Sequence, residues 1–143
     1  MPTARTPPIY TSPQDVTQAF YQAFEARDLD AMMATWADDE DIVCIHPGGV
    51  RHVGYEAVRM SFEHLFSGNA KLTFRLDQPV LIETVGLALQ SAVEHLRTGD
   101  EGPRGAAIAT NVLMRTPSGW RVVCHHASPS PPVTDVPQAG PLH

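Results

Sequence analysis

The chain has 143 residues, of which 43% are hydrophobic and 18% charged, and its formal net charge is −6 from 10 basic and 16 acidic side chains. This size and composition predict one soluble globular domain with its own core. The acidic balance argues against a nucleic-acid partner, because phosphate binding needs a basic face. No apolar run approaches the ~20 residues of a membrane span, so no membrane partner is expected.

Proline marks the expected domain limits. Most of the 13 prolines lie in residues 1–13 and 129–143, which is typical of extended, poorly ordered tails. We therefore predict tails over residues 1–11 and 129–143 and one ordered domain over residues 12–128.

Three helices are expected in the first half of the chain. Ser12, Pro13 and Asp15 have the order of a helix start, and an apolar stripe follows them. Asp28 can cap a second, short helix. A third is expected from Tyr55 to about residue 67, closed by a glycine C-cap within residues 67–69.

Strand patterns dominate the second half. A short hairpin is expected over residues 42–46 and 50–53, before the third helix. Four longer runs, over residues 71–83, 87–97, 106–115 and 119–128, predict consecutive antiparallel strands, with a bend at Pro79. This order predicts an α+β fold with the helices gathered on one face of a curved sheet.

Both cysteines, Cys44 and Cys124, lie in apolar strand-like runs. We predict reduced thiols in a cytoplasmic protein rather than a disulfide. The sequence has no CxxC pair and no Cys/His cluster with metal-site spacing, so no metal or other cofactor is expected.

Four stretches together resemble the SnoaL-like branch of the nuclear transport factor 2-like superfamily, which includes ketosteroid isomerase. Within it, the chain looks similar to the association domain of calcium/calmodulin-dependent protein kinase type II. The stretches are ARDLDA at 26–31 with Trp36, CIHPGG at 44–49 before Gly54, SFEHLFS at 61–67, and TNV at 110–112 through WRVVCHHAS at 120–128.

The resemblance implies a cone-shaped α+β half-barrel in which three helices close a mainly antiparallel sheet around a deep apolar pocket. It also implies a homodimer formed through the outer sheet faces. The run 87–97 supports the second point independently, because it is apolar on both faces and so needs cover on both sides.

The resemblance places Glu94, Asn111 and Ala127 on the inward face of the sheet. The association domain has arginines at these positions, so its anion pocket is not expected here. Strand alternation then turns His125 inward and His126 outward. The helical wall of the pocket is expected to consist of Val58, Phe62 and Phe66.

Glu94 is the strongest candidate for a catalytic residue. A carboxylate among apolar side chains has a raised pKa, which makes it a usable general acid or base. His125 is its expected proton partner, and Asn111 is a candidate donor to an oxyanion. The alternative is an ion pair between Glu94 and Arg75 or Arg115.

Two further residues have open roles. His46 either reaches the pocket mouth or bonds the adjacent loop backbone. Trp36 either belongs to the core or offers its indole N–H to a ligand. A metal site formed by His46, His125 and Glu94 is conceivable but lacks metal-type spacing.

Three functions remain open. The first is a cofactor-independent isomerase, hydratase, cyclase or hydrolase that uses Glu94. The second is a non-catalytic module that binds a small, mostly apolar ligand, and the third is an oligomerisation module. The fold alone does not choose among them.

Overall fold

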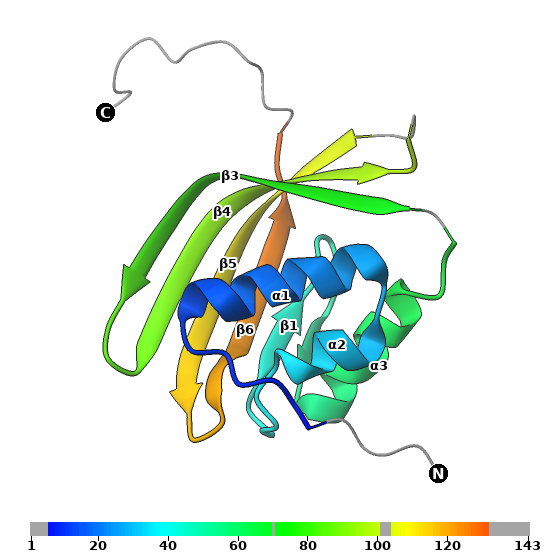
Figure 1. Cartoon of the computed structure of the whole chain (residues 1–143). Helices are drawn as coiled ribbons and strands as arrows, with labels where there is room; N and C mark the ends of the chain where they lie inside the picture. The colour runs from blue at the N-terminus through cyan, green and yellow to red at the C-terminus, as the bar shows by residue number, and fades with distance from the viewer. Residues whose placement is uncertain (1–5, 70, 101–103, 132–143) are drawn as a thin grey trace, which may run out of the picture.

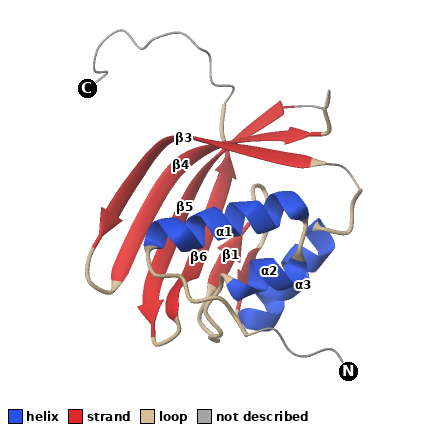
Figure 2. Ribbon diagram, viewed as in Figure 1, coloured by secondary structure: helices blue, strands red, loops and turns tan. Residues whose placement is uncertain are grey.

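A computed structural model describes residues 6–69, 71–100 and 104–131 of the chain. Six strands form one open sheet in the order β2-β1-β6-β5-β4-β3, and three helices pack on one side of it (Figures 1 and 2). Neighbouring strands are antiparallel except β1 and β6, which are parallel. The α+β class is confirmed. The elements are α1 Pro13–Ala26, α2 Leu29–Ala34, β1 Val43–Ile45, β2 Arg51–Val53, α3 Tyr55–Leu65, β3 Leu72–Glu83, β4 Leu87–Thr98, β5 Arg104–Thr116 and β6 Gly119–Pro129.

The first two helix starts are as predicted. The Ser12 side chain accepts a hydrogen bond from the Asp15 backbone N–H at 3.1 Å, and the Asp28 side chain accepts one from the Ala31 N–H at 3.1 Å. Each bond satisfies a backbone donor that has no partner within its helix. Arg27 lies between the two helices in the left-handed conformation, with φ of 51°, and so redirects the chain.

The predicted glycine C-cap of α3 is wrong. The helix ends at Leu65, and its C-cap residue, Phe66, has right-handed backbone angles. Ser67 explains the difference, because its backbone N–H and its hydroxyl both donate to the carbonyl of His64, at 3.2 and 2.7 Å. A terminal carbonyl is thereby satisfied without a left-handed glycine.

The predicted bend in β3 is present. The pairing of β3 with β4 shifts register between Asp77 and Val80, and Gln78 has a φ of 51°. Pro79 lies at this shift, where its missing N–H removes no ladder hydrogen bond. The bend lets the far half of the sheet curve around α1 (Figure 1).

Part of the expected N-terminal tail contacts the sheet. The Trp120 N–H donates to the carbonyl of Tyr10 at 2.8 Å, and Arg121 Nη2 donates to the carbonyl of Pro8 at 2.7 Å. Gly119 permits this approach, because a Cβ there would lie 2.7 Å from the Tyr10 oxygen. Residues 1–5 and 132–143, which belong to the two expected tails, lie outside the described residues.

The core lies between α1 and the concave face of the sheet. Alternation along β4 buries Ala88, Ala92 and Glu94, whereas Leu87 and Leu89 on the convex face are 47% and 37% exposed. The helices thus cover one face of the sheet only. Aromatic rings fill most of the space beneath α1, and they belong to Phe20, Phe24, Trp36, Phe62, Phe66 and Phe74.

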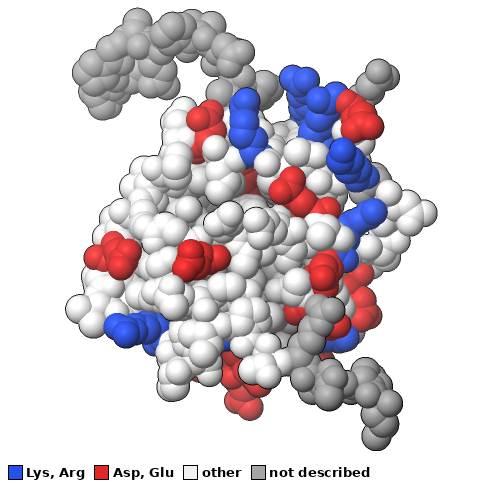
Figure 3. Space-filling model, viewed as in Figure 1, with Lys and Arg blue, Asp and Glu red and all other residues white. Residues whose placement is uncertain are grey.

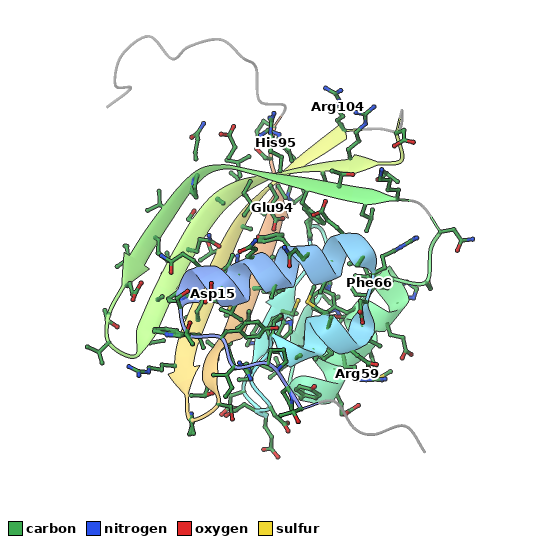
Figure 4. The ribbon with its side chains drawn as sticks, viewed as in Figure 1. Asp15, Arg59, Phe66, Glu94, His95 and Arg104 are labelled. Carbon is green, nitrogen blue, oxygen red and sulfur yellow. The ribbon has the colours of Figure 1, made fainter. Side chains whose placement is uncertain are left out.

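Charged side chains of both signs are scattered over the face that carries α1, and a group of basic ones lies near Arg104 on β5 (Figures 3 and 4). Cys44 and Cys124 are both free, as predicted. No helix in the described part of the chain is long and apolar enough to cross a membrane.

Candidate ligand cavity

A cavity of about 420 Å³ opens between the C-terminal end of α1, the end of β1 and the strands β3 to β6. Its volume is within the range of small-molecule sites. Three titratable side chains, Glu94, His46 and His125, interrupt a lining that is otherwise mostly apolar. The large apolar side chains of the lining are Phe24, Leu65, Leu72, Phe74 and Leu96.

Glu94 lies on β4 between the curved sheet and α1, and its neighbour His95 lies on the opposite side of the strand (Figure 4). Glu94 is only 5% exposed. Its Oε2 accepts a hydrogen bond of 2.5 Å from the hydroxyl of Tyr21 on α1. Burial raises the pKa of Glu94, and the bond from Tyr21 offsets part of that rise.

The alternative arginine pair is wrong. No ion pair among the described residues joins Glu94 to Arg75 or Arg115, both of which are exposed. The carboxylate therefore depends on Tyr21 for its hydrogen bond. The Tyr21 pKa is raised in turn by burial and by the nearby Glu94 charge, so the phenol stays protonated.

Asn111 extends this contact into a row of four hydrogen-bonded side chains. Its Nδ2 donates to the Tyr21 oxygen at 3.2 Å, and its Oδ1 lies 2.5 Å from Nδ1 of His125. The same Nδ2 also donates to Oε1 of Gln90 at 3.5 Å. Asn111 and His125 are direct partners across β5 and β6, so the sheet register holds them together. The network runs from His125 through Asn111 and Tyr21 to Glu94.

His125 and His126 face opposite sides of β6, as predicted. His125 is 2% exposed and its ring centroid lies 4.9 Å from that of Phe20, whereas His126 is exposed. Burial, together with the neighbouring His46 and His126, lowers the pKa of His125 to about 3. His125 is therefore a neutral imidazole at physiological pH.

His46 lines the cavity from the end of β1, which supports the first of its two alternatives. Its Nε2 lies 3.1 Å from the Ser61 hydroxyl on α3, and its ring meets Phe62 edge-on at 4.9 Å. Burial and the nearby His52 lower the pKa of His46 to about 4. The side chain thus contacts α3 rather than the loop backbone.

The expected aromatic and apolar wall lies mostly beneath the cavity. Val58 and Phe62 have no exposed surface, and neither is among the lining residues. Phe66 packs on Phe24 and Phe62 in the half-buried part of the core. These side chains support the lining residues instead of facing a ligand.

Trp36 and Ala127 also lie apart from the cavity lining. Trp36 is 2% exposed and packs on Phe20 and Phe62. Its buried indole N–H has no hydrogen-bond partner within the described residues. Ala127 packs with Ala107 and Ala109 in a small alanine cluster on the sheet.

Tyr21, Phe24 and Phe74 contribute to the site without having been predicted as site residues. Tyr21 is buried on α1 directly beside the apolar stripe. A buried tyrosine usually has a hydrogen-bond partner, so the position of Tyr21 beside the stripe could have indicated a buried polar contact. Within the described residues, no group of histidine, cysteine or acidic side chains has an arrangement that could hold a metal ion.

An open, curved sheet covered by helices on its concave face, with a cavity at one end, defines a cone-shaped α+β class of domain. The chain belongs to the SnoaL-like domain family, whose model matches residues 14–133. This match confirms the resemblance inferred from the four sequence stretches.

Many solved structures are similar to this chain, and two examples are more than a quarter identical to it over most of its length. A candidate calcium/calmodulin-dependent protein kinase type II association domain from Thiobacillus denitrificans shares 40% identity and a TM-score of 0.78, covering 87% of this chain and 99% of that one. A candidate dehydratase of the NTF2-like family from Streptomyces avermitilis shares 29% identity and a TM-score of 0.75, covering 82% and 92%.

A curated relative is longer. F-box protein SKIP8 from Arabidopsis thaliana is 26% identical over 113 residues, which is 79% of this chain. The chain spans about half of that protein's length, 47%.

Proposed function

We propose that the chain binds a small, mostly apolar organic molecule in the cavity and that Glu94 acts on it as a general acid or base. One observation carries this proposal. Glu94 is a buried carboxylate on the wall of an apolar cavity, and it is held by a tyrosine rather than neutralised by a basic residue. The reaction class is a cofactor-independent isomerisation, hydration, dehydration, cyclisation or hydrolysis.

The network assigns different roles to its members. Tyr21 holds Oε2 of Glu94, which leaves Oε1 to exchange a proton with a ligand. The raised pKa of Glu94 lies closer to the working pH, and a group with such a pKa can both give and take a proton effectively. The amide nitrogen of Asn111 donates to Tyr21, and its amide oxygen lies against His125. Asn111 therefore acts as a positioning residue instead of the expected oxyanion donor.

Replacing Glu94 by glutamine tests the catalytic part of this proposal. Turnover of a ligand found by mass spectrometry of the purified protein is expected to fall roughly 10²–10⁴-fold, the usual contribution of general acid–base catalysis. The rate in the unsubstituted protein should also follow a titration above the ordinary glutamate pKa, since burial raises it.

The matched control is Glu63→Gln, which changes an exposed glutamate on α3 whose one ion pair within the described residues is with Arg59. It should keep both the rate and the pH profile. Turnover that survives in Glu94→Gln would reject catalysis by Glu94. A bound ligand that the unsubstituted protein never turns over would leave a non-catalytic binding module.

The convex sheet face favours self-association as a second property. Ile82, Leu89, Val112 and Cys124 are paired across β3, β4, β5 and β6 and form one apolar row on that face. No helix of the described part of the chain covers this face, and Ile82 and Leu89 are 60% and 37% exposed. A second copy of the chain is the proposed cover, in line with the association-domain description of one similar structure. The free thiols fit a reducing, cytoplasmic location.

Leu89→Glu is expected to convert a homodimer into a monomer. The substitution places a charge at the centre of the apolar row, where a partner would have to desolvate it. Sedimentation velocity measures the change in mass. Met60→Glu, on the exposed face of α3 where Met60 is 64% exposed, should leave the dimer intact. A monomeric unsubstituted protein would contradict the self-association proposal.

A further inference from the structure

When Glu94 is ionised, the donor and the acceptor of each hydrogen bond in the network are determined. A carboxylate can only accept, so the Tyr21 hydroxyl donates its single hydrogen to Glu94. The Tyr21 oxygen must then accept from the Asn111 amide nitrogen, which leaves the Asn111 carbonyl facing His125. His125 therefore carries its hydrogen on Nδ1, and its Nε2 is an unprotonated acceptor. Nε2 has no hydrogen-bond partner within the described residues.

The second histidine is oriented by the same reasoning. The Ser61 hydroxyl donates its only hydrogen to the carbonyl of Val58 at 2.7 Å. Nε2 of His46 lies 3.1 Å from the serine oxygen and 3.7 Å from Sγ of Cys44, and with the serine hydrogen on Val58 we assign the Nε2 hydrogen to the serine oxygen. This leaves Nδ1 of His46 as an unprotonated acceptor on a residue that lines the cavity.

The side-chain atoms that this network leaves free on the three titratable lining residues are acceptors. They are Nε2 of His125, Nδ1 of His46 and Oε1 of Glu94. No lysine or arginine is among the described residues that line the cavity. A carboxylate or phosphate ligand would meet lone pairs and a like charge in an apolar space, which is a costly arrangement.

We propose that the ligand is an uncharged, mostly apolar hydroxyl compound, a phenol or an alcohol, whose hydroxyl donates to Nε2 of His125 or to Oε1 of Glu94. This inference rests on the proposed ligand-binding function and adds the chemical class of the ligand. Tyr21 and Asn111 are positioning residues in it, because they determine which atom of His125 faces the ligand.

Four small probes of similar size test the class: p-cresol, p-methylanisole, p-toluate and benzylamine. Calorimetric or ligand-detected NMR titration at about pH 8 measures their affinities. We expect p-cresol to bind roughly tenfold or more tightly than p-methylanisole, since the ether keeps the ring and the oxygen but has no hydrogen to donate. We expect p-toluate to bind more weakly than p-cresol, because it carries a like charge and has no hydrogen to donate. We expect benzylamine to bind more weakly too, because its ammonium group has to leave water for a mostly apolar lining. Equal affinity for the phenol and its ether, or tighter binding of either charged probe, would overturn the inference.

His125→Phe should reduce the preference for p-cresol over p-methylanisole, whereas His126→Phe, on the exposed face of the same strand, should retain it. The ¹⁵N chemical shifts of His125 provide a readout that needs neither a variant nor a ligand. They should show a protonated Nδ1 and an unprotonated Nε2, and the reverse tautomer would overturn the network direction.

The outcomes separate this inference from the proposed function. Binding of p-toluate in the cavity, located by chemical-shift changes at residues such as Phe74 and Leu96, would keep a ligand-binding domain and reject the hydroxyl class. Binding of none of the probes, together with purified protein free of any small molecule, would reject both.

Discussion

Replacing Phe62 by alanine is expected to lower the free energy of unfolding by about 3–5 kcal/mol, the usual cost of a large aromatic cavity. Phe62 has no exposed surface and joins α3 to the centre of the core. Because its neighbours belong to several elements, the space left by the ring cannot close by moving one of them. Five rings lie around it with centroids 4.9–6.1 Å away, those of Phe20, Phe24, Trp36, Phe66 and His46.

Urea unfolding of the two proteins measures this difference. Met60→Ala is the matched control on the same helix, because Met60 is 64% exposed and a surface change usually stays within about 0.5 kcal/mol. A loss below about 1 kcal/mol for Phe62→Ala would mean that the ring faces an open cavity, as the sequence first suggested, rather than a packed core.

Local chemistry made most of the fold predictable. Ser12 and Asp28 have short polar side chains at the positions where a helix needs an acceptor, and both cap as expected. The resemblance placed Glu94 and Ala127 on the inward face, and alternation along β6 then turned His125 the same way; both Glu94 and His125 are buried. The end of α3 was missed because Ser67 and a left-handed glycine are two local solutions to the same requirement.

The candidate site was only partly predictable, because its contacts join elements distant in sequence. Strand alternation brings Asn111 and His125 to one face, but it does not say which helix residue lies above them. The rotation of α1 on the sheet decides that Tyr21 meets Glu94, 73 positions away. The same packing places Phe24 and Phe74 in the cavity lining and leaves Phe62 beneath it.

The protein is expected to lose stability as the pH falls from 7 towards 4.5, with His125 as a principal cause. Burial lowers the folded-state pKa of His125 to about 3, below its ordinary value of 6.5. Such a group contributes its full stability above the unfolded pKa and loses it as the pH falls towards the folded pKa. His46 acts in the same direction, with its pKa lowered to about 4.

Glu94 acts in the opposite direction. Its raised pKa makes the folded state less favourable as the pH rises through that pKa, so acidification relieves this cost. Tyr21 and Asn111, the other members of the network, remain uncharged over this range. A variant that removes only His125 therefore isolates its contribution from that of the carboxylate.

Chemical unfolding of the unsubstituted protein, His125→Phe and His126→Phe at pH 7 and 4.5 measures this contribution. Each pH unit of titration corresponds to about 1.4 kcal/mol, so His125 should account for about 2–3 kcal/mol of the loss at pH 4.5. His125→Phe should lose that much less than the unsubstituted protein, and comparing each variant with itself cancels any change in its packing. His126 is exposed, so His126→Phe should lose as much as the unsubstituted protein. Equal losses of stability in all three proteins would show that water reaches the His125 ring in solution. The wall of the cavity would then also be solvated.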